Sequence, residues 1–341
     1  MRRLTVCAYF AFCVAASAAV DGIVTNGTTG KPQPGATVTL FQPTQQGPQF
    51  VESVKTDAAG KFSITKAPPS SAPGPLLLQA VYAGVQYNKT LTPASPTTGV
   101  EIPVYESSKL PGDAKISQHV MLIEPNGTAL MVAELYEFQN DGKTTWNNPD
   151  TGTLLFSLPP AAAGKVDVNV LAPGGLPIRR AADPAGKPNT FKVDFPIKPG
   201  QSEIRMEWSI PFTSPGVLEG SVLAKGAPGL KILAPTGVTL RGDGVTVTGQ
   251  YPATGAIIYS VEGTSYHINV EGSGSLKSDA PADAGSGSPS VSMNMPKLFG
   301  LTVATGDFMD SFLAVKWILG AVLGMLAIGF ALLYRKGNPT R

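Results

Sequence analysis

Short apolar runs, each closed by a cluster of glycine, proline or asparagine, recur from residue 20 to residue 270. GIVTN, ATVTLFQ and KFSITKA are such runs, and NGTTGKPQPG and DAAG are such clusters. β-branched and aromatic residues favour strands, whereas proline and glycine interrupt helices. With 38 Gly and 31 Pro among 341 residues, this punctuation extends over most of the chain. We therefore expect an all-β fold of tandem β-sandwich domains.

Longer alternating runs between residues 114 and 270 indicate a second β-rich region of one or two sandwiches. KISQHVMLIEP and TALMVAELYEFQN are joined by Asn-Gly, which predicts a hairpin. In SEIRMEWSI, apolar residues alternate with polar ones, and this period of two predicts one buried and one wet face. The residues expected to be buried are Ile204, Met206, Trp208 and Ile210, and those expected to be wet are Glu203, Arg205, Glu207 and Ser209.

The first region, residues 20–108, carries a recognisable set of motifs. Gly22 opens the first run, PGATV follows at Pro34–Val38, and Thr56, Asp57, Gly60 and Phe62 form a Thr-Asp-x-x-Gly-x-Phe turn. This pattern resembles the carboxypeptidase regulatory-like domain, which is a transthyretin-like, seven-stranded sandwich. The resemblance implies a structural or binding module that accompanies other activities. It covers about a quarter of the chain and specifies fold far better than function.

The N-terminus is typical of a secretory signal. Arg2 and Arg3 precede the apolar run LTVCAYFAFCVA and the small residues ASAA, so we expect a signal peptide at 1–19. Cys7 and Cys13 are the only cysteines, and both fall in this segment. The mature protein is therefore expected to have neither disulfides nor cysteine-ligated metals.

The C-terminal segment 312–334 predicts a single transmembrane helix, because it is apolar apart from Lys316, is uncharged from Trp317 to Tyr334, and is long enough to span a bilayer core. The cations that follow it place a cytoplasmic tail at 335–341 by the positive-inside bias, and the strand-rich body on the periplasmic or extracellular side. A Gly/Ser/Ala/Pro-rich stretch at 271–295 predicts a flexible linker. Gly320 and Gly324 form Gly-x-x-x-Gly, a candidate face for packing against another membrane helix.

Charge argues against a nucleic-acid partner. The whole chain has a formal charge of +2. Without the cations of the signal and of the membrane-proximal segments, the exported part is acidic by about four charges. A binder of nucleic acid would instead carry a basic surface.

The chemistry-bearing residues do not form a catalytic motif. His119 and His267 are the only histidines, each lies within a strand-like run, and neither Gly-x-Ser-x-Gly nor His-Glu-x-x-His occurs. Ser63-Ile-Thr-Lys66 matches Ser-x-x-Lys, but on a predicted strand rather than a helix. Arg241-Gly242-Asp243 is interpreted as a hairpin turn rather than an adhesion motif.

These patterns favour a non-enzymatic, membrane-anchored exported protein that acts as a binding or assembly module in an envelope complex. No cofactor, metal or small-molecule substrate is expected, and the expected partner is an integral membrane or envelope protein. One alternative is a carbohydrate or cell-wall binder with Tyr82, Tyr87 and Tyr105 as glycan contacts. Another is a type I membrane protein of a eukaryotic secretory pathway, in which the sequons at Asn26, Asn88 and Asn126 would accept glycans.

Overall fold

The computed structural model describes residues 20–44, 47–66, 74–252 and 254–276, which belong to one compact unit. Strands dominate them, and the helical structure among these residues is the single turn η1 (Pro160–Ala162). The all-β prediction is confirmed. Within the described ranges, no helix is long and apolar enough to cross a bilayer. The predicted signal peptide, transmembrane helix and cytoplasmic tail lie outside these residues, as does most of the predicted linker.

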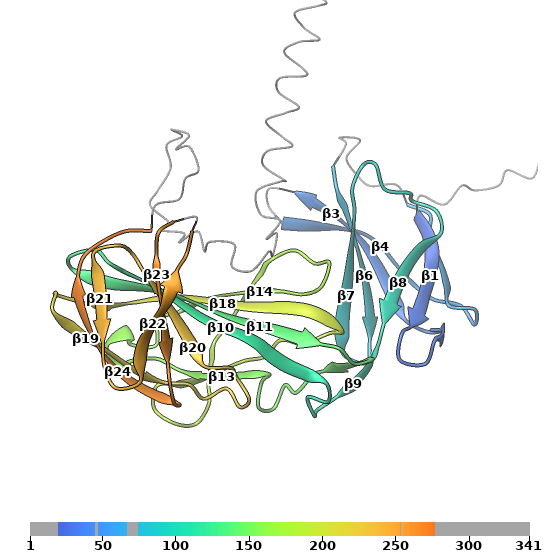
Figure 1. The fold of residues 1–341 in the computed structure, drawn as a ribbon. Coiled ribbons are helices and arrows are strands. Elements are labelled where there is room, and N and C mark those ends of the chain that lie inside the picture. Colours follow the sequence, from blue (N-terminus) through green and yellow to red (C-terminus); the bar gives the residue numbers. More distant parts are fainter. Residues whose placement is uncertain (1–19, 45–46, 67–73, 253, 277–341) are drawn as a thin grey trace, which may run out of the picture. The chain divides into compact units, whose positions relative to one another are not determined.

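Residues 20–104 form two four-stranded sheets that face each other across a common core (Figure 1). The first sheet contains β1 (Val20–Asn26), β2 (Lys31–Pro32), β5 (Lys61–Ile64) and β8 (Val100–Val104). The second has the order β4-β3-β6-β7 and contains β3 (Thr37–Thr44), β4 (Gly47–Lys55), β6 (Leu76–Tyr82) and β7 (Val85–Leu91). Strand β1 pairs in parallel with β8 and antiparallel with β2 and β5.

The Thr-Asp-x-x-Gly-x-Phe turn is built as its residues predict. The carboxylate of Asp57 accepts the backbone N–H groups of Ala59 and Lys61, at 2.9 and 2.8 Å between N and O. Gly60 has a φ of 73°, a conformation that glycine adopts without a Cβ penalty. Phe62 then returns to the core, where it is buried. The turn therefore joins β4 to β5 by local chemistry that any sequence with this motif would share.

The second region is organised around an eight-stranded sheet with the order β15-β14-β18-β11-β10-β20-β23-β22 (Figure 1). Two three-stranded sheets, β13-β17-β16 and β19-β24-β21, accompany it. One continuous hydrophobic cluster, from Ala114 to Val270, fills the interior. The strands of the large sheet are β10 (Ala114–Pro125), β11 (Ala129–Asn140), β14 (Asp167–Leu171), β15 (Ile178–Arg180), β18 (Gly200–Pro211), β20 (Leu230–Ala234), β22 (Val245–Gln250) and β23 (Ile257–Val261). The others are β13 (Leu154–Ser157), β16 (Asp183–Pro184), β17 (Thr190–Val193), β19 (Gly216–Ser221), β21 (Val238–Arg241) and β24 (Ser265–Gly272).

Three local predictions can be compared with this region. The Asn-Gly hairpin is confirmed, because β10 and β11 pair antiparallel on either side of Asn126. The alternation in β18 holds on its apolar side, but Glu203, on the expected wet face, is only 7% exposed. The Arg241–Asp243 hairpin is wrong: β21 pairs with β24 whereas β22 pairs with β23, so this turn carries the chain from one sheet to another.

The start of the predicted linker, 271–295, overlaps the last strand of the second region. Strand β24 continues to Gly272, where Gly272 lies opposite Val238 of β21 and Glu271 lies opposite Thr239. The first two residues of the 271–295 segment therefore belong to a sheet. Composition alone could not show this, because glycine and glutamate are uncommon in strands and the pairing partner comes from far along the chain.

Candidate functional site

The two β regions are joined through a short parallel strand pair. Strand β9 (Glu106–Ser108) pairs with β12 (Thr144–Trp146), and the N–H of Asn147 donates to the carbonyl of Ser108 at 2.8 Å. On one side of this pair, the hydroxyl of Thr28 donates to the carbonyl of Lys143. Backbone hydrogen bonds of this kind fix direction and register, so the junction (β9, β12 and the residues that contact them) is a specific connection between the regions.

Tyr82, Tyr87 and Tyr105, the tyrosines predicted as glycan contacts, all lie near this junction. Tyr87 is 4% exposed, and its hydroxyl lies 2.9 Å from that of Thr145 and donates to the carbonyl of Tyr105 at 3.0 Å. The rings of Tyr87 and Tyr105 have centroids 6.0 Å apart. Burial of Tyr87 favours packing over sugar stacking for that ring, and the glycan role of the three tyrosines stays a prediction.

A polar network beside the tyrosines holds Glu106 in its ionised form. The Tyr82 hydroxyl donates to the Glu106 carboxylate at 2.6 Å, and the Asn26 amide donates to it at 2.8 Å. These two hydrogen bonds, the tyrosine's first, lower the pKa of Glu106, because both favour the charged carboxylate. Asn26 is the first of the three sequons, but it is 3% exposed and its side chain is committed to this network.

A lysine that the sequence patterns did not single out completes the junction. The ammonium of Lys198 lies 5.0 Å from the centre of the Tyr87 ring. Burial, followed in importance by the nearby positive charge of Arg180, lowers its pKa to about 8. Lys198 lies two residues before β18, in an Ile-Lys-Pro-Gly segment that resembles any other loop, so only the three-dimensional contact reveals it.

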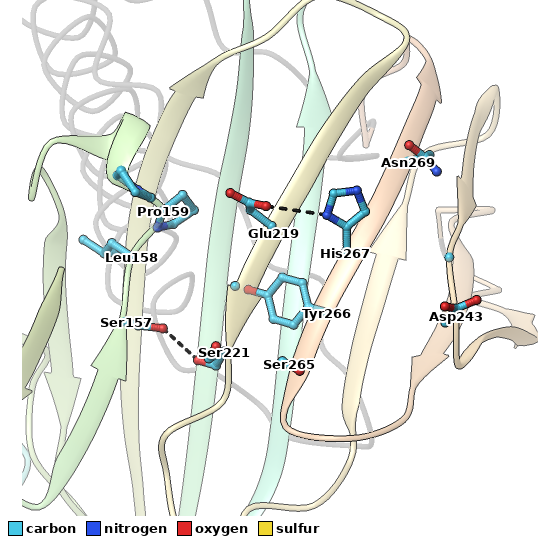
Figure 2. Close-up of a pocket in the computed structure, with 13 residues that line it drawn as sticks. Ser157, Leu158, Pro159, Glu219, Ser221, Asp243, Ser265, Tyr266, His267 and Asn269 are labelled. Atoms are coloured by element: carbon cyan, nitrogen blue, oxygen red, sulfur yellow. Dashed lines mark hydrogen bonds and ion pairs between the residues drawn. The ribbon is translucent and has the colours of Figure 1, made fainter. Parts of the chain in front are cut away.

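A separate groove of about 720 Å³ lies over β19 and β24 of the second region (Figure 2). Its polar lining includes Glu219, His267, Asn269 and Asp243, and Pro159 lies at one side. Glu219 and His267 occupy opposite positions on the two strands, with 3.5 Å between the carboxylate oxygen and Nδ1. This groove (the β19–β24 groove) therefore presents carboxylate, imidazole and amide side chains to solvent.

The groove does not assemble a serine–histidine pair. The Ser157 hydroxyl donates to the backbone carbonyl of Ser221 at 2.8 Å, as Figure 2 shows. Across the described ranges, neither His119 nor His267 has a serine hydroxyl within hydrogen-bond distance, since their partners are Glu134 and Glu219. In the Ser-x-x-Lys match, Ser63 lies in β5 and Lys66 lies two residues beyond its end, so neither is on a helix. Nucleophile activation by either imidazole would require a rearrangement of these contacts.

His119 instead belongs to a buried polar cluster inside the second region. Its Nε2 lies 2.7 Å from a Glu134 carboxylate oxygen, which also accepts the Tyr136 hydroxyl at 2.9 Å. The rings of His119 and Tyr136 stack at 4.1 Å between centroids. Burial, with the Glu134 charge next in importance, raises the pKa of Tyr136 well above its usual range. All three side chains are under 9% exposed, so the cluster is part of the core and inaccessible to a substrate.

The membrane-packing prediction, Gly320 and Gly324, lies outside the described residues. The remaining sequons are described: Asn126 is exposed at the β10–β11 turn, and Asn88 in β7 is half-buried, with its side chain accepting the amide of Gln79 at 3.1 Å. Neither cysteines nor a cluster of metal-ligating side chains occurs among the described residues.

Comparison with known proteins identifies the first region. Residues 19–104 match the carboxypeptidase regulatory-like domain family, which confirms the resemblance drawn from Gly22, Asp57 and Gly60. No curated protein sequence matches the chain.

Solved structures resemble the chain only distantly. An M1 zinc metallopeptidase from Deinococcus radiodurans, a mutant bound to a Tyr-Ser-Ala substrate, is 10% identical over 47% of this chain and 42% of that chain, with a TM-score of 0.25. Another structure of the M1 zinc metallopeptidase from the same organism is 10% identical over 46% and 42%, with a TM-score of 0.24. A two-domain M1 zinc metallopeptidase bound to L-arginine gives the same values. The chain thus spans less than half the length of these structures, and similarity at this level carries no argument about its activity.

Proposed function

We propose that this chain is an exported, membrane-anchored binding or assembly module without catalytic activity of its own. The observation that carries the proposal is the junction, at which β9 and β12 pair and the buried Tyr87 hydroxyl meets Thr145. Such a connection fixes a carboxypeptidase regulatory-like sandwich against a second β region. Two β regions held in a fixed arrangement can position binding partners, whereas many enzymes must open and close around a substrate.

The predicted segments at either end supply the location. A signal at 1–19 and an apolar segment at 312–334 would export the β regions and hold them beside a bilayer. The Gly320 and Gly324 face would then bring an integral membrane partner close to the span, because the missing side chains allow helix backbones to approach. In this proposal the module is an accessory subunit of a membrane or envelope complex.

Anchoring and partner binding can be tested together on the full chain. We expect it to sediment with membranes and to co-purify with a defined membrane protein after gentle detergent extraction. A chain ending at residue 311 should appear in the soluble fraction, and Gly320→Leu with Gly324→Leu should stay anchored but lose the partner. A full chain found free in the soluble fraction would contradict the proposal. Hydrolase activity that remains with the chain throughout purification would also contradict it.

A carbohydrate ligand is the second candidate, and the β19–β24 groove is the observation that favours it. Glu219, Asn269 and Asp243 present the carboxylate and amide groups that sugar hydroxyls bind, and Glu219 and His267 are more than half exposed. A glycan array probed with the full chain is expected to show binding that Asn269→Ala removes. An array without any bound glycan would exclude this candidate and leave the assembly module intact.

A further inference from the structure

Beside the junction, two strands at the outer edges of their sheets border a pocket of about 420 Å³ (the edge-strand pocket). Strand β7 ends the β4-β3-β6-β7 sheet, and β15 ends the eight-stranded sheet. Gln86 and Asn88 of β7 and Ile178 and Arg180 of β15 line the pocket. An edge strand presents backbone N–H and C=O groups that have no strand partner within its own sheet, and an added strand can bind them.

The pocket contains two cations that lack carboxylate partners. Lys198 and Arg180 both line it, and among the described residues neither has a carboxylate oxygen within salt-bridge distance. Asp194 also lines the pocket but forms no ion pair with either cation. Burial of the Lys198 ammonium and, second, the charge of Arg180 lower the pKa of Lys198 to about 8. An anion bound there would offset both the lost hydration and the repulsion between the two cations.

The lining combines this charge with exposed apolar surface. Leu176 is 55% exposed and Ile178 is 40% exposed, and both line the pocket that contains the two cations. The amide side chains of Gln86, Asn88 and Asn147 add donors and acceptors that match a peptide backbone. A free inorganic anion would use the two cations but not the amides or the apolar edge, whereas an extended peptide would use all three.

We propose that the edge-strand pocket receives an extended acidic segment of a partner protein, whose carboxylate binds Lys198 and Arg180 and whose neighbouring apolar side chain covers Leu176 and Ile178. The inference rests on the proposed function as a binding module and names the chemistry of the partner. Because the pocket is lined from both β regions, the segment binds only while the junction is intact. The pocket is distinct from the β19–β24 groove, which is lined by other strands.

The test uses the full chain in mild detergent and three probes. They are a short fluorescein-labelled peptide of alternating valine and glutamate, the same peptide with glutamine in place of glutamate, and inorganic phosphate as competitor. The glutamate peptide is expected to bind at least about tenfold more tightly than the glutamine peptide, the difference that one charge-assisted contact of ordinary strength produces. Phosphate is expected to compete weakly, because it reaches only the cations.

Substitutions of the two pocket cations test whether the peptide binds in the edge-strand pocket. Lys198→Gln and Arg180→Gln are each expected to weaken the glutamate peptide about tenfold. Arg179→Gln and Lys187→Gln are matched controls that should leave it unchanged, since Arg179 pairs with Asp167 and Lys187 does not line the pocket. Arg180 is exposed, so its variant retains the fold and keeps the test meaningful even if Lys198→Gln is unstable.

Binding should also fall as the pH rises above about 8, where Lys198 loses its charge while Arg180 keeps its own. Four outcomes would overturn the inference: no binding of the glutamate peptide, equal binding of the glutamine peptide, full displacement by phosphate at similar affinity, or variants that bind as well as the unchanged chain. Since none of them affects membrane sedimentation or co-purification, the proposed function would survive a failure of this inference.

Discussion

The two β regions have interiors of different chemistry. The first buries an aliphatic and aromatic cluster, and its buried polar residues are all uncharged in every usual state: Asn26, Thr39, Gln42 and Thr56. The second region buries ionisable side chains as well, namely His119, Glu134, Glu137 and Glu203. A mainly apolar core depends on shape, whereas a core with buried charges depends on the pairing of particular atoms.

The buried ionisable side chains of the second region constrain the register in which β10 and β11 pair. His119 of β10 lies opposite Tyr136 of β11, and Met121 lies opposite Glu134. A slip of one residue would turn these side chains to the other face and leave Glu134 without His119 and Tyr136. We infer that the buried cluster helps to specify the pairing of β10 and β11, two of the three 12-residue strands of the large sheet.

The largest expected effect comes from breaking this cluster. Glu134→Ala removes the shared acceptor of His119 and Tyr136 and should lower the free energy of unfolding by about 3–5 kcal/mol, because polar groups are left buried without partners. Chemical denaturation followed by tryptophan fluorescence measures the loss. As a control, His119→Leu, Glu134→Met and Tyr136→Phe combined should restore most of the stability. A loss below about 1 kcal/mol for Glu134→Ala would contradict the importance of the pairing.

A change of shape in the first region should cost less. Gly22 of β1 lies between Val100 and Phe62, and an added Cβ would overlap the Val100 carbonyl oxygen. Gly22→Ala is therefore expected to destabilise the sandwich by about 1–3 kcal/mol through overpacking. Gly84→Ala, in open space but with a φ of 76°, is the comparison that isolates backbone strain without a contact. Equal losses for the two variants would show that close packing at Gly22 is unimportant.

The junction should give a smaller effect that reaches both regions. Thr145→Val removes the hydroxyl that meets Tyr87 and should cost about 0.5–1.5 kcal/mol, the net value of one buried hydrogen bond. Thr39→Val, which removes a hydrogen bond to Ser53 inside the first region, is the matched control. We expect Thr145→Val to separate the unfolding of the two regions, seen by calorimetry as a broadened transition. An unchanged single transition would argue against energetic coupling through Thr145.

The smallest expected changes in stability come from two carboxyl groups, Glu106 and Glu207, whose pKa values are shifted in opposite directions. Hydrogen bonds from Tyr82 and Asn26 lower the pKa of Glu106. The stabilisation of the folded state by ionised Glu106 is therefore present above the ordinary pKa of 4.5 and is lost as the pH falls through the lowered pKa. Burial raises the pKa of Glu207, so the folded state loses stability as the pH rises from 4.5 through the raised pKa.

Two substitutions separate these contributions. At neutral pH, Glu106→Gln should lower the melting temperature and Glu207→Gln should raise it, each by less than about 1 kcal/mol in free energy. Both differences should shrink as the pH approaches the acid end of the range. Thermal melts recorded from acid to neutral pH check the signs, and two differences of the same sign at neutral pH would contradict the account.

Local chemistry explains which features the sequence predicted. The Asp57–Gly60 turn, the hairpin at Asn126 and the apolar side of β18 depend on residues close together in the chain, and each was predicted from them. The path of the chain after Arg241 was not, because Asp-Gly turns look alike whether the following strand pairs with the preceding one or joins another sheet.

The features that the sequence did not predict depend on contacts between residues far apart in the chain. Lys198 meets Tyr87, and Glu106 meets Asn26 and Tyr82, across separations that no periodicity encodes. The burial of Glu134 was equally hidden, since its alternation with apolar neighbours looks the same in a strand that keeps its charges in water. The junction and the edge-strand pocket therefore emerge only from the folded chain.

Hydrogen–deuterium exchange of the full chain tests the junction most directly. If β9 and β12 connect the two β regions as firmly as core strands connect their own sheets, the amide of Asn147 should exchange as slowly as the amides in the middle of β11. The N–H of Asn147 donates to the carbonyl of Ser108, so its exchange requires the two regions to separate. Exchange of this amide at the rate of the exposed loop at Lys187, with β11 still protected, would contradict a firm connection.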